Sequence, residues 1–162
     1  MKSYAFGFKE VSKNFQNIKA LNSVSLDIPL NSIFGLLGPN GSGKSTLMRI
    51  LAGLIKSWEG TLKIGDDFLT SGNSEYLKNF GFLIESPSFY EYLSAFDNLK
   101  IFSRLMRIDT ESISKVLETV NLTERGNDKV KTYSYGMKQR LGLAQCLLHD
   151  PKILILDEPN NG

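Results

Sequence analysis

The sequence has very little cysteine, the residue that is abundant in many small secreted proteins and in redox-active sites. It has one cysteine in 162 residues, Cys146. A single cysteine cannot form a disulfide within the chain, which excludes a disulfide framework and is typical of a reducing compartment. Leucines stand at the nearby positions 143, 147 and 148. We therefore expect Cys146 to be a small buried apolar residue and not a nucleophile.

The chain also lacks a long apolar run. No stretch approaches the roughly 18 apolar residues that a membrane-spanning helix needs. Residues 1–10 reach a pair of charged side chains before the apolar core of a signal peptide could develop. If the protein works at a membrane, we expect another chain to span that membrane.

The chain also has no large excess of positive or negative charge. Lys and Arg outnumber Asp and Glu by only 19 to 17, which gives a net charge of +2. This balance argues against a basic stripe, the usual mark of a nucleic-acid-binding surface, and we expect no nucleic-acid partner. The chain also has no internal repeat, linker or low-complexity tract.

What is present is typical of a folded domain. The hydrophobic fraction of 41% and the charged fraction of 22% are those of a soluble globular protein. A chain of 162 residues is long enough for one domain with a sizeable core.

A glycine-rich run is the most informative feature of the chain. It fits the phosphate-loop pattern of Gly, four residues, Gly, Lys, then Ser or Thr, and it consists of Gly38, Pro39, Asn40, Gly41, Ser42, Gly43, Lys44, Ser45 and Thr46. Glycines let such a loop turn tightly and aim successive N–H groups at one centre, and the start of a helix adds partial positive charge there. We expect the whole run to bind a nucleoside triphosphate, with Lys44 between the outer two phosphates and the Ser45 hydroxyl on Mg²⁺.

The segments on either side agree with that interpretation. The apolar run Ile33–Leu37 predicts a buried strand that enters the loop. Helical spacing after the loop predicts one buried helix face, made of Leu47, Ile50, Leu51 and Leu54. The alternative is a glycine-rich turn that precedes a lysine by chance.

The rest of the pattern predicts an α/β protein with a helical insert. Strand-like pieces cover residues 4–11, 24–28, 59–65 (followed by the turn former Gly65–Asp67), 81–85 and 152–156. Helical spacing joins Leu99, Phe102 and Met106, and then Ile113, Val116, Leu117 and Val120, with Asp109 or Thr110 as a cap. A third helix is expected over 134–148, ending at His149–Pro151. The α/β core then comprises about 1–85 and 151–162, and the helical subdomain about 86–150.

Two adjacent carboxylates end the last predicted strand. Asp157 and Glu158 follow four apolar residues, as in the second metal-binding strand of phosphate-loop ATPases. Asp157 would hold Mg²⁺, directly or through water, and Glu158, on the opposite face, would orient and deprotonate the attacking water. The alternative is a buried strand with an acidic exit.

At this point the chain resembles a known family along its whole length, the ATP-binding subunits of ABC transporters. Residues 133–140 resemble the family's signature motif, which follows the pattern Leu-Ser-Gly-Gly-Gln. The segment departs from that pattern through Tyr133, Tyr135 and Met137 and keeps Ser134 and Gly136. A Ser hydroxyl and a backbone N–H at a helix start can hold a γ-phosphate, so the resemblance assigns both residues to ATP binding. A plain capped helix is the alternative.

Two more positions match the family. Phe15 stands where the family has an aromatic ring that stacks on adenine, although a core position is the other interpretation. Glu85 stands where most members have a Gln that touches Mg²⁺ and relays the state of the nucleotide. The run Leu83–Tyr90 resembles the corresponding loop of bacitracin-resistance and lantibiotic-immunity transporters.

The family pattern continues beyond Gly162 to a switch histidine. The only histidine here, His149, belongs to a helix-ending turn, and we expect a surface or cap residue. The resemblance therefore implies a phosphate-loop core of the ABC type whose C-terminal part is absent. We expect the strand before Asp157 to be left partly uncovered, with marginal stability and a tendency to associate.

The resemblance implies a function as well. The full-length protein would be the ATPase of an exporter of a peptide antibiotic or similar substrate, with ATP and Mg²⁺ as its cofactors. Its partners would be a second ATP-binding subunit, most simply a copy of itself, and a membrane permease, which would put it on the cytoplasmic face of the membrane. The alternative from another class is a fragment that binds nucleotide without hydrolysing it. Chromosome and repair ATPases share these motifs but usually carry a long coiled coil, and no sustained heptad run appears here.

Overall fold

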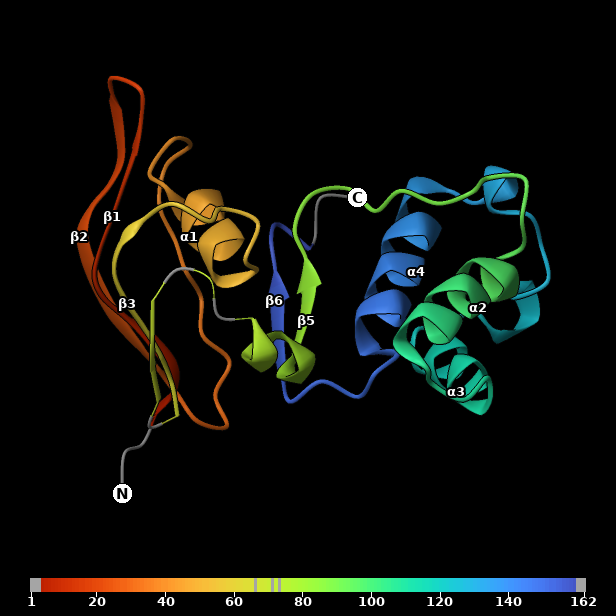
Figure 1. Cartoon of the computed structure of the whole chain (residues 1–162). Coiled ribbons are helices and arrows are strands. Elements are labelled where there is room, and N and C mark those ends of the chain that lie inside the picture. The colour runs from red at the N-terminus through yellow and green to blue at the C-terminus, as the bar shows by residue number, and fades with distance from the viewer. Residues whose placement is uncertain (1–3, 66, 71, 73, 160–162) are drawn as a thin grey trace. The chain divides into compact units, whose positions relative to one another are not determined.

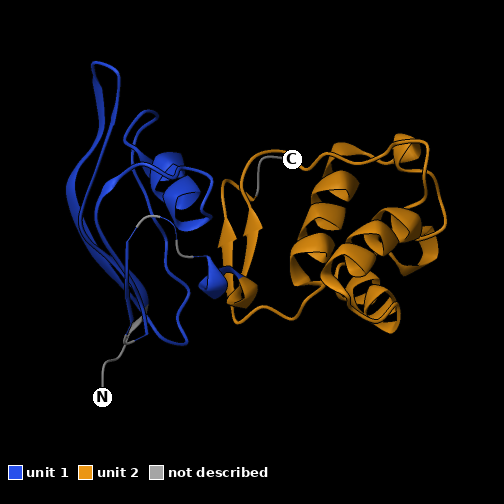
Figure 2. Ribbon diagram, in the orientation of Figure 1, with its two compact units in different colours: residues 1–77 blue, residues 78–162 orange. Residues whose placement is uncertain are grey.

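The computed structural model describes residues 4–65, 67–70, 72 and 74–159. The chain forms two compact units, residues 1–77 and 78–162, which Figure 2 colours separately. The predicted turn residue Asp66 and the C-terminal residues 160–162 lie outside the described residues.

An antiparallel sheet dominates unit 1. Its strands are β1 (Tyr4–Phe15), β2 (Ile18–Pro29), β3 (Glu59–Ile64) and β4 (Asp67–Leu69), in the order β2-β1-β3-β4 (Figure 1). β1 and β2 form a hairpin in which Phe15 pairs with Ile18, and the turn residue Gln16 has a φ of 50°. The strands predicted over 4–11, 24–28 and 59–65 are confirmed.

The predicted buried strand over Ile33–Leu37 is wrong. Residues 32–39 have no regular secondary structure. Ile33 is fully exposed and Leu37 is 92% exposed. A strand needs a neighbour for its backbone groups, and no strand in the described part of the chain pairs with this segment. The apolar pattern alone was therefore not enough to make this segment a strand.

The helix after the glycine loop is confirmed, although it is shorter than its pattern predicts. α1 spans Lys44–Leu51 and buries Leu47, Ile50 and Leu51. Leu54, expected on the same face, lies beyond the helix and is 68% exposed. The helix ends earlier because the chain turns at Gly53, which has a φ of 71°.

Unit 2 has two parallel strands, one before its helices in the sequence and one after them. β5 (Phe80–Leu83) pairs with β6 (Ile153–Leu156) in a register that sets Phe80 beside Ile153 and Leu83 beside Leu156. The predicted strands over 81–85 and 152–156 are confirmed, with Ile84 and Glu85 beyond the end of β5. A short 3₁₀ helix, Glu75–Asn79, precedes β5.

Helices fill the sequence between these strands. They are α2 (Ala95–Met106), α3 (Glu111–Thr119) and α4 (Tyr135–Leu147), with 3₁₀ turns at Thr123–Arg125 and Val130–Thr132 (Figure 1). One apolar core joins the three helices, and its fully buried members include Leu99, Ile113, Val130, Leu141 and Ala144. All three predicted helices are confirmed.

The helix ends add two details. Met106, which shares helical spacing with Leu99 and Phe102, is 47% exposed in the last turn of α2. Of the two candidate caps of α3, the Asp109 carboxylate accepts the N–H of Glu111 at 3.0 Å, whereas the Thr110 side chain makes no capping bond. The predicted boundaries between an α/β core and a helical subdomain stay a prediction.

Candidate functional site

The glycine loop precedes α1 and holds a tight backbone turn. Gly41 and Gly43 have φ values of 81° and 92°, a region that L side chains rarely adopt. The N–H of Ser42 donates to the carbonyl of Pro39 at 3.2 Å, and the N–H of Leu47 donates to Gly43 at 2.9 Å. Residues 37–42 are exposed, so the loop presents its backbone to solvent at a helix N-terminus, which suits an anionic ligand.

Packing excludes a side chain at Gly43, where backbone lies in the way, and crowds one at Gly38. A Cβ on Gly43 would lie 2.7 Å from both the Ala20 carbonyl oxygen and the Leu21 side chain. A Cβ on Gly38 would lie 2.7 Å from the Ser42 hydroxyl. The loop therefore rests on β2 at one end and folds on itself at the other, which fixes its shape.

The Lys44 ammonium lies over the loop. Its Nζ donates to the carbonyl oxygens of Gly38, at 2.8 Å, and Pro39, at 3.0 Å. This places a positive charge beside the backbone of the same loop, where it adds to the field of the α1 N-terminus. The arrangement can hold a group with several negative oxygens, as the sequence predicts.

Phe15 ends β1 with an exposed ring. The side chain is 44% exposed, which excludes the core interpretation. The Lys13 ammonium lies 4.9 Å from the centroid of the ring, a cation–π contact that the sequence analysis did not foresee. The alternation of side chains along a strand, which sets Lys13 and Phe15 on one face, was the only signal for it. Adenine stacking on this ring stays a prediction.

Three predicted carboxylates gather at one end of the parallel strands of unit 2. Glu85 lies two residues after β5, and Asp157 and Glu158 directly follow β6. The N–H of Asp157 donates to the Leu83 carbonyl at 2.8 Å, which prolongs the ladder between the strands. Glu85 and Glu158 are exposed and have φ values of 76° and 48°, so both strands end in abrupt turns.

The donors predicted for Mg²⁺ fit a hard cation. Ser45 in the first turn of α1 offers a hydroxyl, and Glu85 and Asp157 offer carboxylates. Among the described residues, no group of three or more His, Cys, Asp or Glu side chains could by itself hold a metal ion. The assignment of these three residues to Mg²⁺ stays a prediction.

The N-terminus of α4 carries the two residues that match the signature motif. Ser134 is the N-cap, and its Oγ accepts the N–H of Met137 at 3.3 Å. No hydrogen bond among the described residues uses the N–H of Gly136, and a Cβ there would meet nothing within 4 Å. Packing therefore does not require this glycine, and its absent side chain leaves the backbone open at a helix start. The helix predicted over 134–148 is confirmed, and the assignment of Ser134 and Gly136 to ATP binding stays a prediction.

His149 and Cys146 are structural. His149 is half-buried, and its Nε2 lies 2.9 Å from the Phe80 carbonyl, so it ties the turn after α4 to β5 and is not a surface residue. Cys146 is buried as predicted, and its Sγ lies 2.9 Å from the Phe82 carbonyl. Burial raises the pKa of this thiol to about 11, which keeps it protonated and unreactive near neutral pH.

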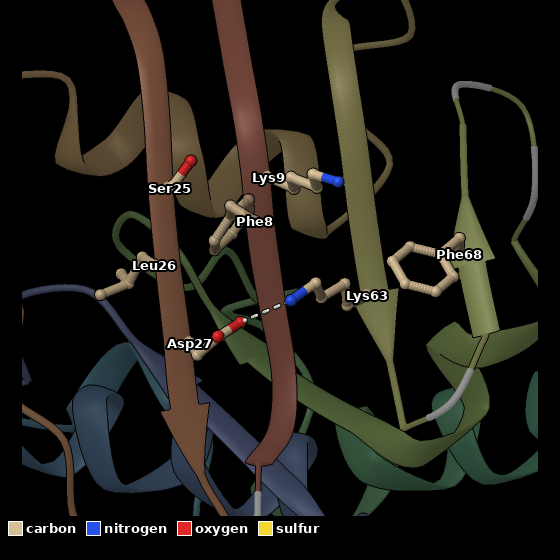
Figure 3. Close-up of a pocket in the computed structure, with 7 residues that line it drawn as sticks. All are labelled: Phe8, Lys9, Ser25, Leu26, Asp27, Lys63 and Phe68. Carbon is tan, nitrogen blue, oxygen red and sulfur yellow. Dashed lines mark hydrogen bonds and ion pairs between the residues drawn. The ribbon is translucent and has the colours of Figure 1, made fainter. Parts of the chain in front are cut away.

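A hollow of about 400 Å³ on the sheet of unit 1 holds none of the predicted site residues. Figure 3 shows Lys63 reaching across β1 to Asp27, with Nζ and Oδ1 3.3 Å apart. The strand between them has Gly7 at this level, and a Cβ there would lie 2.3 Å from the Asp27 carboxylate. The rings of Phe8 and Phe68 line the hollow, and its charged pair, Lys63 and Asp27, is paired internally. This lining shows no feature that would select a particular ligand. Its lining consists of Phe8, Lys9, Ser25, Leu26, Asp27, Lys63 and Phe68.

Sequence reasoning missed one residue that shapes the segment after Glu85. Asn98 in α2 is fully buried, and its side-chain oxygen accepts the N–H of Tyr90 at 2.9 Å. Its Nδ2 donates to the carbonyls of Tyr90, at 3.1 Å, and Ser94, at 2.8 Å. A polar residue on the buried side of a predicted helix was the available signal.

Comparison with known proteins places this arrangement in a family. The sequence model described as "ABC transporter" matches residues 21–161. An uncharacterized ABC transporter ATP-binding protein of Bacillus subtilis, YhcH, is 47% identical over 155 residues, which are 95% of this chain and 51% of YhcH. The lantibiotic transport ATP-binding protein SrtF of Streptococcus pyogenes is 39% identical and covers 95% of this chain and 66% of its own length. The bacitracin transport ATP-binding protein BcrA of Bacillus licheniformis is 39% identical and covers 94% of this chain and 50% of its own length.

Solved structures show the same fold. A nucleotide-free ATP-binding cassette from an ABC transporter has a TM-score of 0.87 at 22% identity and covers 98% of this chain and 70% of its own. The dimeric post-hydrolysis state of the cassette MJ0796, bound to ADP and phosphate, has a TM-score of 0.81 at 26% identity and covers 96% of this chain and 74% of its own. Across the residues that the structure describes, no helix has the length and apolar character of a membrane span. The chain spans about half to two thirds of the curated relatives named above. With its family pattern matched over residues 21–161 and its cassette fold, the chain belongs to the ABC transporter family and has the α/β fold of the family's ATP-binding domain.

Proposed function

We propose that the whole protein binds and hydrolyses ATP to power an exporter of a peptide antibiotic. The observation that carries the proposal is the glycine loop, where the Lys44 ammonium and the N-terminus of α1 converge on exposed backbone. The similarity to SrtF and BcrA, named for lantibiotic and bacitracin transport, supports the substrate class.

The reaction is an in-line attack of water on the γ-phosphorus of ATP. The bond between that phosphorus and the β,γ-bridging oxygen breaks, and the products are ADP and inorganic phosphate. Lys44 contributes positive charge to the outer phosphates. The Glu158 carboxylate orients the water and accepts its proton. The Phe15 ring stacks on the adenine, a contact that costs little side-chain entropy.

The resemblance to the family assigns Mg²⁺ to the Ser45 hydroxyl and to the Asp157 and Glu85 carboxylates. When bound, Mg²⁺ neutralises charge on the phosphate oxygens. Glu85 is a stronger ligand than the amide that most of the family has at this position, and it brings extra negative charge near the γ-phosphate. Of these donors, Glu85 and Asp157 follow the ends of β5 and β6, and Ser45 lies in the first turn of α1.

We further propose that two subunits share each ATP. The glycine loop of one copy and the Ser134–Gly136 segment of the other would hold the phosphates from two sides, and a two-fold axis would make both sites from one surface. The similarity to the MJ0796 cassette, which is dimeric in its post-hydrolysis state, supports this assembly. A membrane permease would complete the transporter and hold the protein at the cytoplasmic face of the membrane.

Two substitutions in the full-length protein test the proposal. Lys44→Ala removes the charge over the glycine loop and should weaken Mg-ATP binding by about 100-fold, because charge-assisted hydrogen bonds are lost. The matched control is Lys56→Ala, an exposed lysine outside the loop. Equal affinity of both variants in calorimetry would refute the assignment of Lys44.

Glu158→Gln keeps the shape of the side chain and removes the base. ATP should still bind, turnover should fall by about 10²–10⁴-fold, and an ATP-bound dimer should accumulate. Normal phosphate release would remove Glu158 from the base role. Glu124→Gln, at an exposed glutamate in a 3₁₀ turn, serves as the control.

The second candidate is nucleotide binding without hydrolysis. Steady-state phosphate release separates the two functions. Tight Mg-ATP binding by the chain with no release above the Glu158→Gln background would support binding alone.

A further inference from the structure

The loop after Glu85 is held firmly on one side by α2. Asn98, fully buried, bonds both the N–H and the carbonyl of Tyr90. The N–H of Leu93 donates back to the Tyr90 carbonyl at 3.0 Å and closes a turn over 90–93. The exposed residue Glu91 therefore stands on a rigid turn, and the direction of its side chain is constrained by the backbone beneath it.

The same turn is bonded on its other side to the segment that leads into α4. The N–H of Lys131 donates to the Glu91 carbonyl at 2.9 Å, and the N–H of Val130 donates to Leu93 at 3.0 Å. Ser94 and Lys129 form an antiparallel bridge. The turn and the segment 129–131 therefore behave as one piece, directly before the N-cap of α4.

A side-chain ion pair continues this connection onto α4 itself. Lys138 Nζ contacts Glu91 Oε1, across 47 positions of sequence. Lys138 lies one helical turn after Ser134, and its N–H donates to the Ser134 carbonyl at 3.0 Å. Residues four apart lie on one side of a helix, so the pair pulls on the same side of α4 that carries the N-cap.

A second anchor holds the opposite side of the helix. Arg140 Nη1 donates to the carbonyls of Val120, at 3.2 Å, and Asn121, at 3.0 Å, at the C-terminal end of α3. Residues two apart point to nearly opposite sides of a helix. Lys138 and Arg140 thus hold the first turns of α4 from two directions, in addition to the apolar core beneath the helix.

We propose that Glu91 and Lys138 are positioning residues for the ATP reaction. Their ion pair sets the orientation of the first turn of α4 relative to the loop after Glu85, and with it the Ser134 hydroxyl and the Gly136 N–H. The inference rests on the proposed function, in which these two groups grip the γ-phosphate. A change at the loop would reach that grip through this charge pair as well as through the backbone bonds to residues 129–131. The pair is the part of the connection that is accessible to mutation, since its side chains are 59% and 30% exposed.

The test is a charge-swap cycle in the full-length protein, with kcat and KM for Mg-ATP as the first readout. Glu91→Lys and Lys138→Glu should each lower kcat about threefold to fivefold, the range expected for an exposed ion pair, with KM unchanged. The double variant Glu91→Lys with Lys138→Glu should recover most of kcat. Glu118→Lys, an exposed glutamate on α3, is the control for charge alone. A double variant no better than the single ones would overturn the proposal.

A background substitution separates positioning from a merely structural role. In Ser134→Ala, Glu91→Lys should lower kcat by less than it does in the wild type, because one of the two groups that the pair positions is gone and only the Gly136 N–H remains. An unchanged threefold to fivefold loss in that background would show that the pair acts elsewhere.

The second readout needs no activity. Amide hydrogen exchange at Met137 and Lys138 should accelerate about threefold to fivefold in either single variant and recover in the swap, because the first turn of α4 opens more often. If the wild type hydrolyses no ATP, the proposed function fails while exchange still tests the pair. Unaltered exchange in both single variants would overturn the proposal even if kcat fell.

Discussion

Two apolar runs of this chain both predict buried strands and end in different structures. Ile153–Leu156 is strand β6, paired in parallel with β5 and continued by the bond from Asp157 to Leu83. Ile33–Leu37 has no strand partner in the described part of the chain and exposes Ile33 completely. The comparison teaches that an apolar run becomes a strand only where a second backbone is in place to receive its hydrogen bonds.

The largest expected effect comes from comparing a substitution in the core of unit 2 with one in the exposed run Ile33–Leu37. Leu141 is fully buried among three helices, so Leu141→Ala should cost about 3 kcal/mol of unfolding free energy. Ile33→Ala, at a side chain that buries nothing, should cost less than about 0.5 kcal/mol. Urea unfolding of both variants measures the difference, with circular dichroism for the helices and the fluorescence of Trp58 for unit 1.

The result for Ile33 can break the comparison. A loss above about 1 kcal/mol would mean that another backbone covers this run in solution. Sedimentation of the wild-type chain would then show whether a second copy provides the cover. Stable monomers together with a costly Ile33→Ala would contradict the exposed arrangement outright.

A second test raises the pH and follows the stability of unit 2, where the buried Cys146 thiol lies against β5. Burial raises the pKa of Cys146 to about 11, whereas an unfolded cysteine titrates near 8.5. The folded state therefore holds the thiol proton more tightly, and the resulting stability is complete below about pH 8.5 and is lost as the pH rises toward 11. We expect a loss of about 3 kcal/mol across that window, measured by urea unfolding at a series of pH values.

Cys146→Ala is the control for this titration. It removes the thiol, and the decline between about pH 8.5 and 10 should disappear. The pKa values of Tyr76 and Tyr133 are also raised by burial, so some loss should remain above about pH 10 in both proteins. An identical decline of the wild type and the variant below pH 10 would contradict the assignment to Cys146.

The smallest effect concerns the sheet of unit 1. A Cβ on Gly7 would lie 2.3 Å from the Asp27 carboxylate and 2.9 Å from the Leu26 carbonyl. Gly7→Ala should therefore displace the Asp27–Lys63 ion pair and cost about 1 kcal/mol. Gly35→Ala is the matched control, because a Cβ there meets nothing within 4 Å. Equal thermal midpoints of the two variants would show that the sheet accommodates the extra methyl group.

Local patterns in the sequence were sufficient where the structure is local. The N-cap role of Ser134, the buried face of α3 and the turn of the glycine loop follow from spacing and from backbone freedom, and all three are confirmed. The prediction that the helix after the glycine loop includes Leu54 failed, because the residue at which a helix ends is poorly determined by its apolar spacing.

The sequence by itself determined the glycine loop before α1, the helices of unit 2 and the pair of acidic residues after β6. Each depends on neighbours within a few positions, such as a φ above zero, a capping oxygen or an apolar face. Only the tertiary structure decided that Ile153–Leu156 is a strand and Ile33–Leu37 is not, and that Glu91 meets Lys138. Strand pairing and ion pairs join residues far apart in the chain, and no local pattern records which distant partner the fold provides.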